Sequence, residues 1–312
     1  MTFTGETVEL HGHRGARGLR PENTLPAFRH ALALGVHAIE FDVGLTQDGV
    51  VVLNHDQALS AVTARDTEPA TPGDPHYPYV GKALRALTLA QVRKVDAGTR
   101  HPTQDDDPFV LTQLPVPGTR IPTLAEVCAL LSTVPDVRLA VELKTDPSWP
   151  DTEVTRFTAA VAEVLQAFGL SARSRLLAFD WRVLVEARRY IPDAGRVALI
   201  ERVTAVPGTP WSAGLDTVDP VAAALDVGAT SLSPEMAMTT PALVEHAQSL
   251  ALPVSVWTVN EPSDMTRYLS YGVNAIVTDY PDRLHTVLSD HGLPVPIPRP
   301  NLLPIPNGAP TP

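Results

Sequence analysis

The chain has 312 residues, of which 44% are hydrophobic and 19% charged, a composition typical of a globular protein with a large buried core. Its formal net charge of −11 argues against nucleic acid or an anionic membrane as the main partner. It also means that an anionic substrate would need a cation or local basic residues where it binds.

The N-terminal segment, MTFTGETVEL, lacks a basic stretch followed by a long apolar run, so no secretory signal is recognisable. The sequence also holds no apolar run long enough to span a bilayer. We therefore expect a cytoplasmic protein. A mature periplasmic or secreted form with a removed leader would look the same and stays an alternative.

Short apolar segments alternate with amphipathic segments along most of the chain. The apolar segments are rich in Val, Ile and Leu, as expected of parallel strands that are buried on both faces. The eight predicted strands are Val8–His13, Ala38–Val43, Leu139–Lys144, Arg175–Phe179, Val197–Ile200, Ser231–Ser233, Val254–Val259 and Ala275–Thr278. Eight strand–helix units predict a (β/α)8 TIM barrel of the α/β class. A doubly wound sheet is the alternative, because the number of strands does not show closure.

Helical spacing of apolar residues is clearest over Glu153–Phe168. Further helices are predicted at Thr123–Leu131, at Pro241–Leu250 and at Ser263–Leu269, where the first residue resembles a helix start. The single cysteine, Cys128, excludes an internal disulfide. Because it lies in an apolar run, we predict a buried core thiol.

Two regions depart from this alternation. Residues Gln57–Thr119 are rich in Pro, Gly and Asp and contain one weak helix near Leu89–Val95, so we interpret them as an insertion between the second barrel strand and its helix. Such insertions often wall the active site of a barrel. We predict a single barrel domain over residues 1–292, with the insertion at about 57–119, and a Pro-rich extended tail over residues 293–312.

Acidic side chains cluster where predicted strands end. Glu40 and Asp42 share one side of the second strand, and Glu142 lies at the end of the third. Buried charges are costly unless they are paired or bound to metal, so a structural ion pair is the simpler explanation for any one of them. Several strands that carry such groups at the catalytic end of a barrel favour a functional site. Three carboxylates without a soft ligand suit Ca²⁺ or Mg²⁺, with Mn²⁺ also possible.

Histidines and basic residues occupy comparable positions. His11 and His13 lie on one side of the first strand, and His55 follows a brief apolar run. Arg14 and Lys144 are the natural partners for phosphate oxygens, and Arg can bind two of them at once. A metal ion together with these two cations would offset the acidic net charge at the place where a phosphate ester binds.

Two longer blocks carry a specific resemblance. HRGARGLRPENTLPAF at His13–Phe28 and IEFDVGLTQDGVVVLNHD at Ile39–Asp56 are similar to the signature of the glycerophosphodiester phosphodiesterase family. The later VELK, AFDW (Ala178–Trp181) and VWTVN…GVNAIVTDYPD (Val256–Asp282) resemble the same family. The resemblance leaves out the insertion and the tail. It implies a (β/α)8 barrel with an insertion after the second strand.

The resemblance implies metal-dependent hydrolysis of a small glycerophosphodiester to glycerol phosphate and an alcohol. Imidazoles suit this chemistry because they titrate near neutral pH. We expect His55 to protonate the leaving group and His13 to assist attack by water, or by a glycerol hydroxyl that first forms a cyclic phosphate. The implied roles are a catalytic acid–base pair (His13, His55), metal ligands (Glu40, Asp42, Glu142), phosphate-binding residues (Arg14, Lys144) and a pocket wall (Trp257).

Some residues and roles have competing interpretations. Trp257 could be a core aromatic on a barrel strand. Glu22 and Asn23 in PENT resemble a motif that shapes the first βα loop, but Pro21 and Glu22 also fit a plain helix start, so neither Glu22 nor Asn23 is predicted to be catalytic. His11-Gly-His13 matches the His-x-His of metal-dependent barrel hydrolases, but later strands lack the further histidines, so we expect His11 to support the pocket. A non-catalytic binding barrel is the remaining alternative. The head group and the oligomeric state are not predicted.

Overall fold

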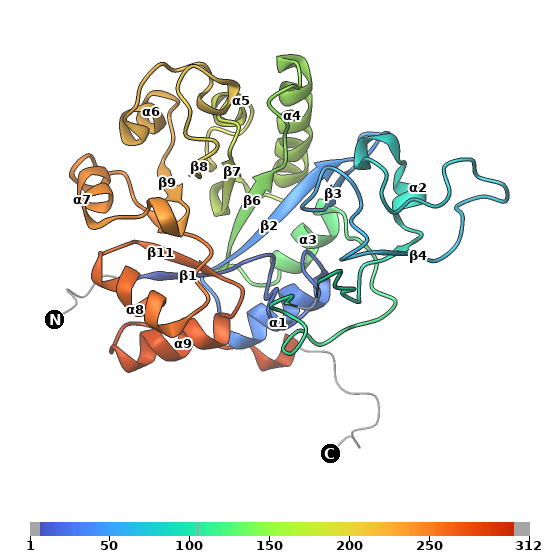
Figure 1. Ribbon diagram of the computed structural model, residues 1–312, viewed down its shortest axis with the longest axis horizontal. Coiled ribbons are helices and arrows are strands. Elements are labelled where there is room, and N and C mark those ends of the chain that lie inside the picture. Colours follow the sequence, from blue (N-terminus) through green and yellow to red (C-terminus); the bar gives the residue numbers. More distant parts are fainter. Residues whose placement is uncertain (1–6, 105, 303–312) are drawn as a thin grey trace.

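A parallel sheet closed into a barrel organises the molecule. The computed structural model describes residues 7–104 and 106–302. Eight parallel strands follow one another in the order β10-β11-β1-β2-β6-β7-β8-β9. Parallel bridges from Leu232 to Val254 and from Glu235 to Trp257 join β9 to β10. The two edges of the sheet therefore meet, which confirms the predicted (β/α)8 barrel (Figure 1).

The barrel strands agree closely with the predicted segments. Only the strand predicted at Val254–Val259 is much shorter in the structure, where β10 covers Ser255–Val256. Beyond β10 the chain pairs only through isolated bridges. The strands are β1 (Glu9–Gly12), β2 (Ala38–Leu45), β6 (Arg138–Leu143), β7 (Ser174–Ala178), β8 (Gly195–Ile200), β9 (Ser231–Pro234), β10 (Ser255–Val256) and β11 (Ala275–Thr278).

A helix covers the outside of the barrel after each strand (Figure 1). α4 shows why: its apolar residues recur at helical spacing and are buried against the sheet. α8 begins at Pro262 rather than at the predicted Ser263, because proline fits the first turn of a helix. The helices are α1 (Leu25–Leu34), α3 (Leu124–Leu131), α4 (Asp151–Ala167), α5 (Arg182–Tyr190), α6 (Pro220–Asp226), α7 (Pro241–Ser249), α8 (Pro262–Ser270) and α9 (Pro281–Asp290).

Alternation along the strands separates two environments. On β2, Ile39, Phe41 and Val43 belong to the large core between sheet and helices, while Glu40 and Asp42 occupy the intervening positions and point to the other side. A smaller cluster inside the barrel consists of Ala140, Leu177, Val197 and Leu199. The outer positions thus supply most of the apolar core, and the inner positions near the carboxyl ends are free to carry charge. Cys128 is fully buried in the outer core, as predicted.

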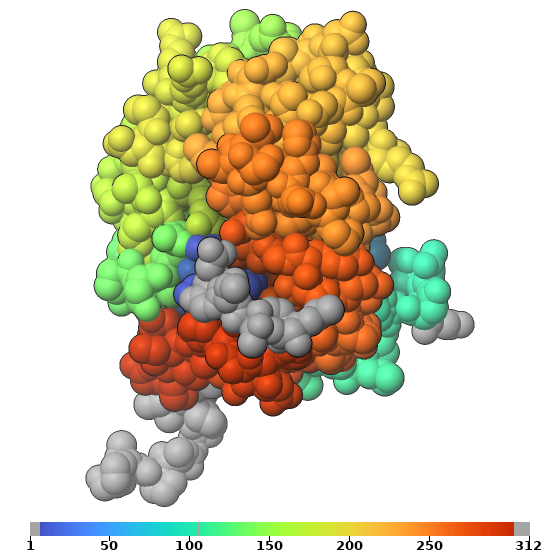
Figure 2. Space-filling view, turned by 90° about the vertical axis from the view of Figure 1, so that its left-hand side faces the viewer, coloured from blue at the N-terminus to red at the C-terminus, as the bar shows by residue number. Residues whose placement is uncertain are grey.

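The segment between β2 and α3 lies beside the barrel (Figure 1), and a part of it projects from the edge of the molecule in Figure 2. It has its own apolar core, which includes Leu59, Tyr79 and Leu87. α2 ends at Val92 because the chain then enters β5, so the predicted helix to Val95 is too long. Its elements are β3 (Val51–Leu53), β4 (Arg65–Asp66), η1 (Leu84–Ala86), α2 (Leu89–Val92) and β5 (Val95–Asp96).

The described part of the Pro-rich segment lies against α1. The Arg299 backbone N–H donates to the carbonyls of Leu32 and Ala33, and Pro300–Leu302 form a 3-10 helix (η5) within the stretch predicted to be extended. Residues 303–312, with Pro304 and Pro306, lie outside the described residues. Short 3-10 helices also occur as η2 (Ser171–Arg173), η3 (Pro210–Ser212) and η4 (Met236–Met238). No helix in the described ranges is long and apolar enough to cross a membrane.

Candidate active site

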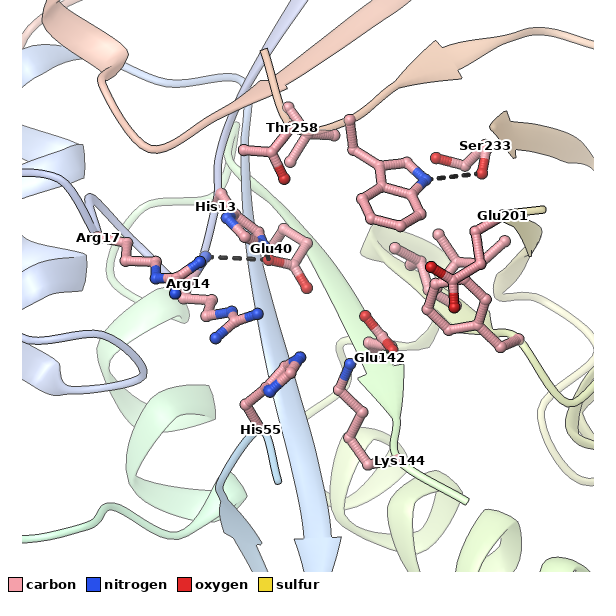
Figure 3. A pocket seen from close by; sticks show the side chains of 15 residues that line it. His13, Arg14, Arg17, Glu40, His55, Glu142, Lys144, Glu201, Ser233 and Thr258 are labelled. Atoms are coloured by element: carbon pink, nitrogen blue, oxygen red, sulfur yellow. Dashed lines mark hydrogen bonds and ion pairs between the residues drawn. The ribbon is translucent and has the colours of Figure 1, made fainter. Parts of the chain in front are cut away.

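A cavity of about 450 Å³ opens at the carboxyl ends of the barrel strands. This is the end at which TIM-barrel enzymes carry their active sites. Figure 3 shows charged side chains converging on it from several strands and loops. Seven of the eight predicted site residues line the cavity: His13, Arg14, Glu40, His55, Glu142, Lys144 and Trp257. The eighth, Asp42, is buried next to Glu40 and Glu142.

Three carboxylates meet at the cavity: Glu40 and Glu142 line it, and Asp42 is buried beside them. Asp42 on β2 lies directly opposite Glu142 on β6 in the parallel register, and Glu40 precedes Asp42 by two residues on the same face. One oxygen from each lies within 4.8 Å of the others. Glu40 Oε1 is buried and lacks a hydrogen-bond partner among the described residues. An all-oxygen donor set with an unsatisfied buried oxygen fits a hard divalent cation.

Burial and mutual repulsion set the ionisation of this triad. Burial, reinforced by the charges of Asp42 and Glu142, raises the pKa of Glu40 well above its usual range. Burial also raises the pKa of Glu142. Asp42 behaves differently: burial alone would raise its pKa, but Lys144 and Arg14 hold it well below the usual range. The triad is therefore short of positive charge, which a bound cation would supply.

Arg14 and Lys144 flank the triad from opposite sides. Lys144 Nζ lies 3.1 Å from Asp42 Oδ1 and also donates to Glu142 Oε1. Arg14 Nε lies 3.2 Å from Asp42 Oδ2, and Arg14 NH1 lies 2.6 Å from Glu22. Both basic side chains are nearly buried and keep raised pKa values despite their desolvation, because these carboxylates surround them. Two fixed positive groups thus face the cavity beside the candidate metal ligands.

His13 is oriented by a chain of hydrogen bonds. Its Nδ1 lies 2.7 Å from Asp279 Oδ1, and the other Asp279 oxygen accepts from Asn260 Nδ2 at 2.7 Å. The remaining ring nitrogen, Nε2, lies 3.8 Å from Glu40 Oε2 at the cavity. Burial lowers the pKa of His13, while the Asp279 carboxylate opposes that shift. The carboxylate therefore fixes which nitrogen of the ring faces the cavity.

His55 approaches from the other side of the cavity. It follows β3 and the Asn54 turn, and its Nδ1 lies 2.7 Å from Asp56 Oδ1. Figure 3 shows His13 and His55 apart, with Arg14 and Glu40 between them. Each imidazole is therefore paired with a carboxylate through Nδ1, and the two rings flank the space in which a substrate phosphate would contact Arg14.

The first loop after β1 holds the triad in place. Asn23 Nδ2 donates to Asp42 Oδ2 at 2.8 Å, and the Asp42 backbone N–H donates back to Asn23 Oδ1 at 3.1 Å. Arg14 and Asn23 adopt positive φ angles of 48° and 56°, an uncommon conformation that the surrounding contacts stabilise. The Arg14 backbone N–H meanwhile donates to Glu40 Oε2 at 2.9 Å. This loop is a structural clamp on the triad.

The far wall of the cavity is mainly apolar. Trp257 packs edge-to-face against Phe179 with ring centroids 5.5 Å apart, and its Nε1 donates to the Ser233 carbonyl at 2.9 Å. Leu177 and Leu199 complete the wall. Trp257 thus lies both on the cavity and against the inner barrel cluster. Its position therefore fits both interpretations, a pocket wall and a core aromatic on a barrel strand.

His11 lies elsewhere, so its expected supporting role at this pocket is wrong. It lines a second cavity of about 370 Å³ at the amino ends of the strands, where its Nε2 lies 2.8 Å from Glu9. Glu9 in turn pairs with Arg175. His11 and His13 therefore do not share a metal ion, and the only candidate metal cluster among the described residues is the acidic triad.

Several functional neighbours were not predicted. Asp279 and Asn260 orient His13, Asn23 clamps Asp42, and Glu22 binds Arg14. Asp279 could have been found, because it directly follows the last barrel strand, as the other polar groups follow theirs. The contacts of Asn23 and Glu22 come from loop geometry and have no comparable sequence pattern.

Sequence comparison identifies relatives over nearly the whole chain. The model of the glycerophosphoryl diester phosphodiesterase family matches residues 13–283. The glycerophosphodiester phosphodiesterase of Caldanaerobacter subterraneus subsp. tengcongensis is 28% identical over 281 residues, covering 90% of this chain and 97% of that protein. The glycerophosphodiester phosphodiesterase of Bacillus subtilis (strain 168) is 27% identical over 282 residues, covering 88% of this chain and 84% of that protein.

Solved structures share the fold. A protein of Silicibacter pomeroyi DSS-3 superposes with a TM-score of 0.79 and 32% identity, covering 94% of this chain and 96% of that one. A phosphodiesterase of Oleispira antarctica, solved with the product sn-glycerol-3-phosphate, superposes with a TM-score of 0.67 and 22% identity, covering 91% of this chain and 97% of that one. The latter likeness is one of fold alone.

Proposed function

Because the chain belongs to the glycerophosphoryl diester phosphodiesterase family, we propose that it hydrolyses glycerophosphodiesters to glycerol phosphate and an alcohol in the cavity at the carboxyl ends of the strands. One observation carries the proposal. A buried triad of carboxylates faces two imidazoles across a cavity that also presents Arg14 and Lys144. This is the combination that phosphoryl transfer needs, since charge must be stabilised while protons move.

Glu40, Asp42 and Glu142 would hold one divalent cation through carboxylate oxygens, and Ca²⁺ or Mg²⁺ suits such a donor set, with Mn²⁺ also compatible. When bound, the ion supplies a positive charge that stabilises the phosphoryl oxygens. Arg14 and Lys144 would bind the remaining phosphate oxygens from either side. The surrounding carboxylates keep both residues charged and in place.

The two histidines would move the protons. His13 Nε2 would accept the proton of the attacking oxygen, from water or from a glycerol hydroxyl of the substrate. A new P–O bond would form as the bond to the alcohol breaks, and His55 would give its proton to the departing alkoxide. Where the glycerol hydroxyl attacks, the product of this step is a cyclic phosphate, and a water molecule would then add to phosphorus and break the ring P–O bond to give glycerol phosphate, with the two histidines exchanging roles. The contact between Asp279 and His13 Nδ1 supports this role for His13, because it leaves Nε2 directed at the cavity and stabilises the protonated ring.

The test is release of glycerol phosphate from glycerophosphodiesters, assayed with Mg²⁺, Ca²⁺ or Mn²⁺. We expect a chelator to abolish activity and one of these ions to restore it. His13→Ala and His55→Ala should each lower kcat by about 10²–10⁴, the usual contribution of a positioned acid or base. His246→Ala is the matched control, since His246 lies half-exposed on α7 beside Asp219. Full activity in either site variant would contradict the mechanism.

A further inference from the structure

The active-site cavity has two chemically unlike ends. One end carries Arg14, Lys144 and the acidic triad, which suits a phosphate and its metal ion. The other end carries the Phe179–Trp257 pair and a single carboxylate, Glu201. The two ends adjoin at Phe179, whose ring centroid lies 5.8 Å from Lys144 Nζ. Figure 3 shows Glu201 across the cavity from Arg14 and His55. A substrate that spans the cavity therefore meets the basic side chains and the candidate metal ligands at one end, and the aromatic pair with Glu201 at the other.

Glu201 is a carboxylate without a partner. It directly follows β8 and is half-buried on the cavity wall. Its backbone N–H binds Thr204 Oγ1, but its carboxylate makes no hydrogen bond or ion pair with any residue in the described ranges. Burial and the nearby charge of Glu235 raise its pKa, and Lys144 opposes that shift. A partly buried carboxylate beside a second one is stabilised by a cation.

The surface around Glu201 favours a cation that needs few hydrogen bonds. Leu177, Leu199 and the Phe179 ring present only carbon atoms to the cavity. Trp257 offers its ring, because its Nε1–H is already donated to the Ser233 carbonyl. A polyol such as glycerol or inositol would find only the Glu201 carboxylate and the Ser233 and Thr258 hydroxyl groups as side-chain partners on this wall. An ammonium group instead gains from aromatic faces and from one carboxylate.

We propose that Glu201, Phe179 and Trp257 form a subsite for an ammonium group on the alcohol of the substrate. The enzyme then prefers zwitterionic phosphodiesters, whose alcohol is an amino alcohol of the choline or ethanolamine class, over phosphodiesters with a neutral polyol. The phosphate binds at the Arg14 and Lys144 end, and the cationic head group lies against the aromatic wall. This inference rests on the proposed phosphodiesterase activity and assigns its head-group specificity.

The test compares kcat/KM for four substrates with the metal ion that supports activity. Glycerophosphocholine and glycerophosphoethanolamine have a cationic head group, whereas glycerophosphoglycerol and glycerophosphoinositol have a neutral polyol head group. We expect the wild type to prefer the cationic pair. Glu201→Gln should lower kcat/KM for that pair roughly tenfold, the loss of about 1.4 kcal/mol of binding, and leave the neutral pair within about twofold. Glu245→Gln, the same charge change on exposed α7, should leave all four unchanged.

A second variant separates the aromatic wall from the carboxylate. Phe179→Leu keeps an apolar side chain but removes the ring, so it should lower kcat/KM for glycerophosphocholine more than for glycerophosphoglycerol. Hydrolysis of none of the four substrates by the wild type would overturn the proposed function itself. Hydrolysis of all four without a cation preference, or an equal loss for all four in Glu201→Gln, would overturn the ammonium subsite and leave the phosphodiesterase standing.

Discussion

The carboxylate of Asp279 offers a direct test of how His13 works. Asp279→Asn preserves the shape of the side chain and removes a negative charge whose Oδ1 lies 2.7 Å from His13 Nδ1, with both groups buried. Two unit charges 4 Å apart interact by about 4 kcal/mol at an effective dielectric constant of 20. If between two thirds and all of this energy stabilises the protonated His13 ring in the transition state, its loss in Asp279→Asn should lower kcat by about 10²–10³.

The pH profile should move in a direction that the charge dictates. The Asp279 carboxylate raises the pKa of His13 against the lowering effect of burial. Its removal therefore lowers that pKa, and the limb of the kcat/KM profile that His13 governs shifts to lower pH. A shift of the acidic limb would identify His13 as the base, and a shift of the alkaline limb would identify it as the acid. The comparison is made at one metal concentration.

The assay is steady-state release of glycerol phosphate between pH 5 and pH 10, with a thermal melt of each variant. KM should change little, because Asp279 does not line the cavity. Asp282→Asn, an exposed neighbour at the start of α9, is the matched control. A kcat within about threefold of the wild type, with an unshifted profile, would refute the positioning role of Asp279.

Three further predictions concern the rest of the molecule. Burial raises the pKa of the Cys128 thiol to about 12, so a thiol-specific disulfide reagent at pH 8 should react only after unfolding; rapid reaction of the native protein would contradict this. Burial would raise the pKa of Glu9, but bonds from His11 and Arg175 hold it below the usual range. Glu9→Gln should therefore lower Tm at pH 7. The difference should shrink as the pH falls below about 4, because the carboxylate is then protonated in the unfolded chain while it stays ionised in the native protein; a gap that is constant with pH would refute the linkage. A divalent cation at about 100 times its Kd should stabilise the wild type by about 2.7 kcal/mol in thermal melts. An equal stabilisation of Glu40→Gln would show that Glu40 is not a metal ligand.

The strands were predictable because each is a local apolar run. β11 has the predicted limits, Ala275–Thr278, since its neighbours β10 and β1 pair with it over short, continuous stretches. The segment Val254–Val259 was predicted too long for a physical reason. Beyond β10 the backbone still pairs, through the Glu235–Trp257 bridge and the Val259 N–H to Val277, but no continuous ladder forms. The apolar pattern of a segment shows that it is buried. Whether a continuous ladder of hydrogen bonds forms depends on the neighbouring strand, which that pattern does not contain.

The sequence predicted which residues make up the site, but not how far along the barrel each of them lies. The two-residue period correctly puts His11 and His13 on one face of the first strand. Two residues nevertheless advance about 6.6 Å along the strand, so the two rings enter different cavities. The bond between His13 and Asp279 joins residues 266 apart in sequence. It arises because β11 closes the barrel next to β1, which no local pattern encodes.

The inserted segment acts on the site through charge. The Glu22 side chain is largely buried, which would raise its pKa, yet that pKa is lowered, because the carboxylate accepts from Arg14, from Arg17 Nε at 3.1 Å and from Arg100 NH1 at 3.1 Å. Arg100 comes from the insertion, and the ring of Phe109, also from the insertion, lies 4.5 Å from the Arg17 guanidinium and 4.9 Å from that of Arg100. Arg17 lines the cavity. One carboxylate thus ties the insertion to two cavity arginines, so we expect a change at Arg100 to alter the environment of Arg14 and Arg17 without direct contact with substrate.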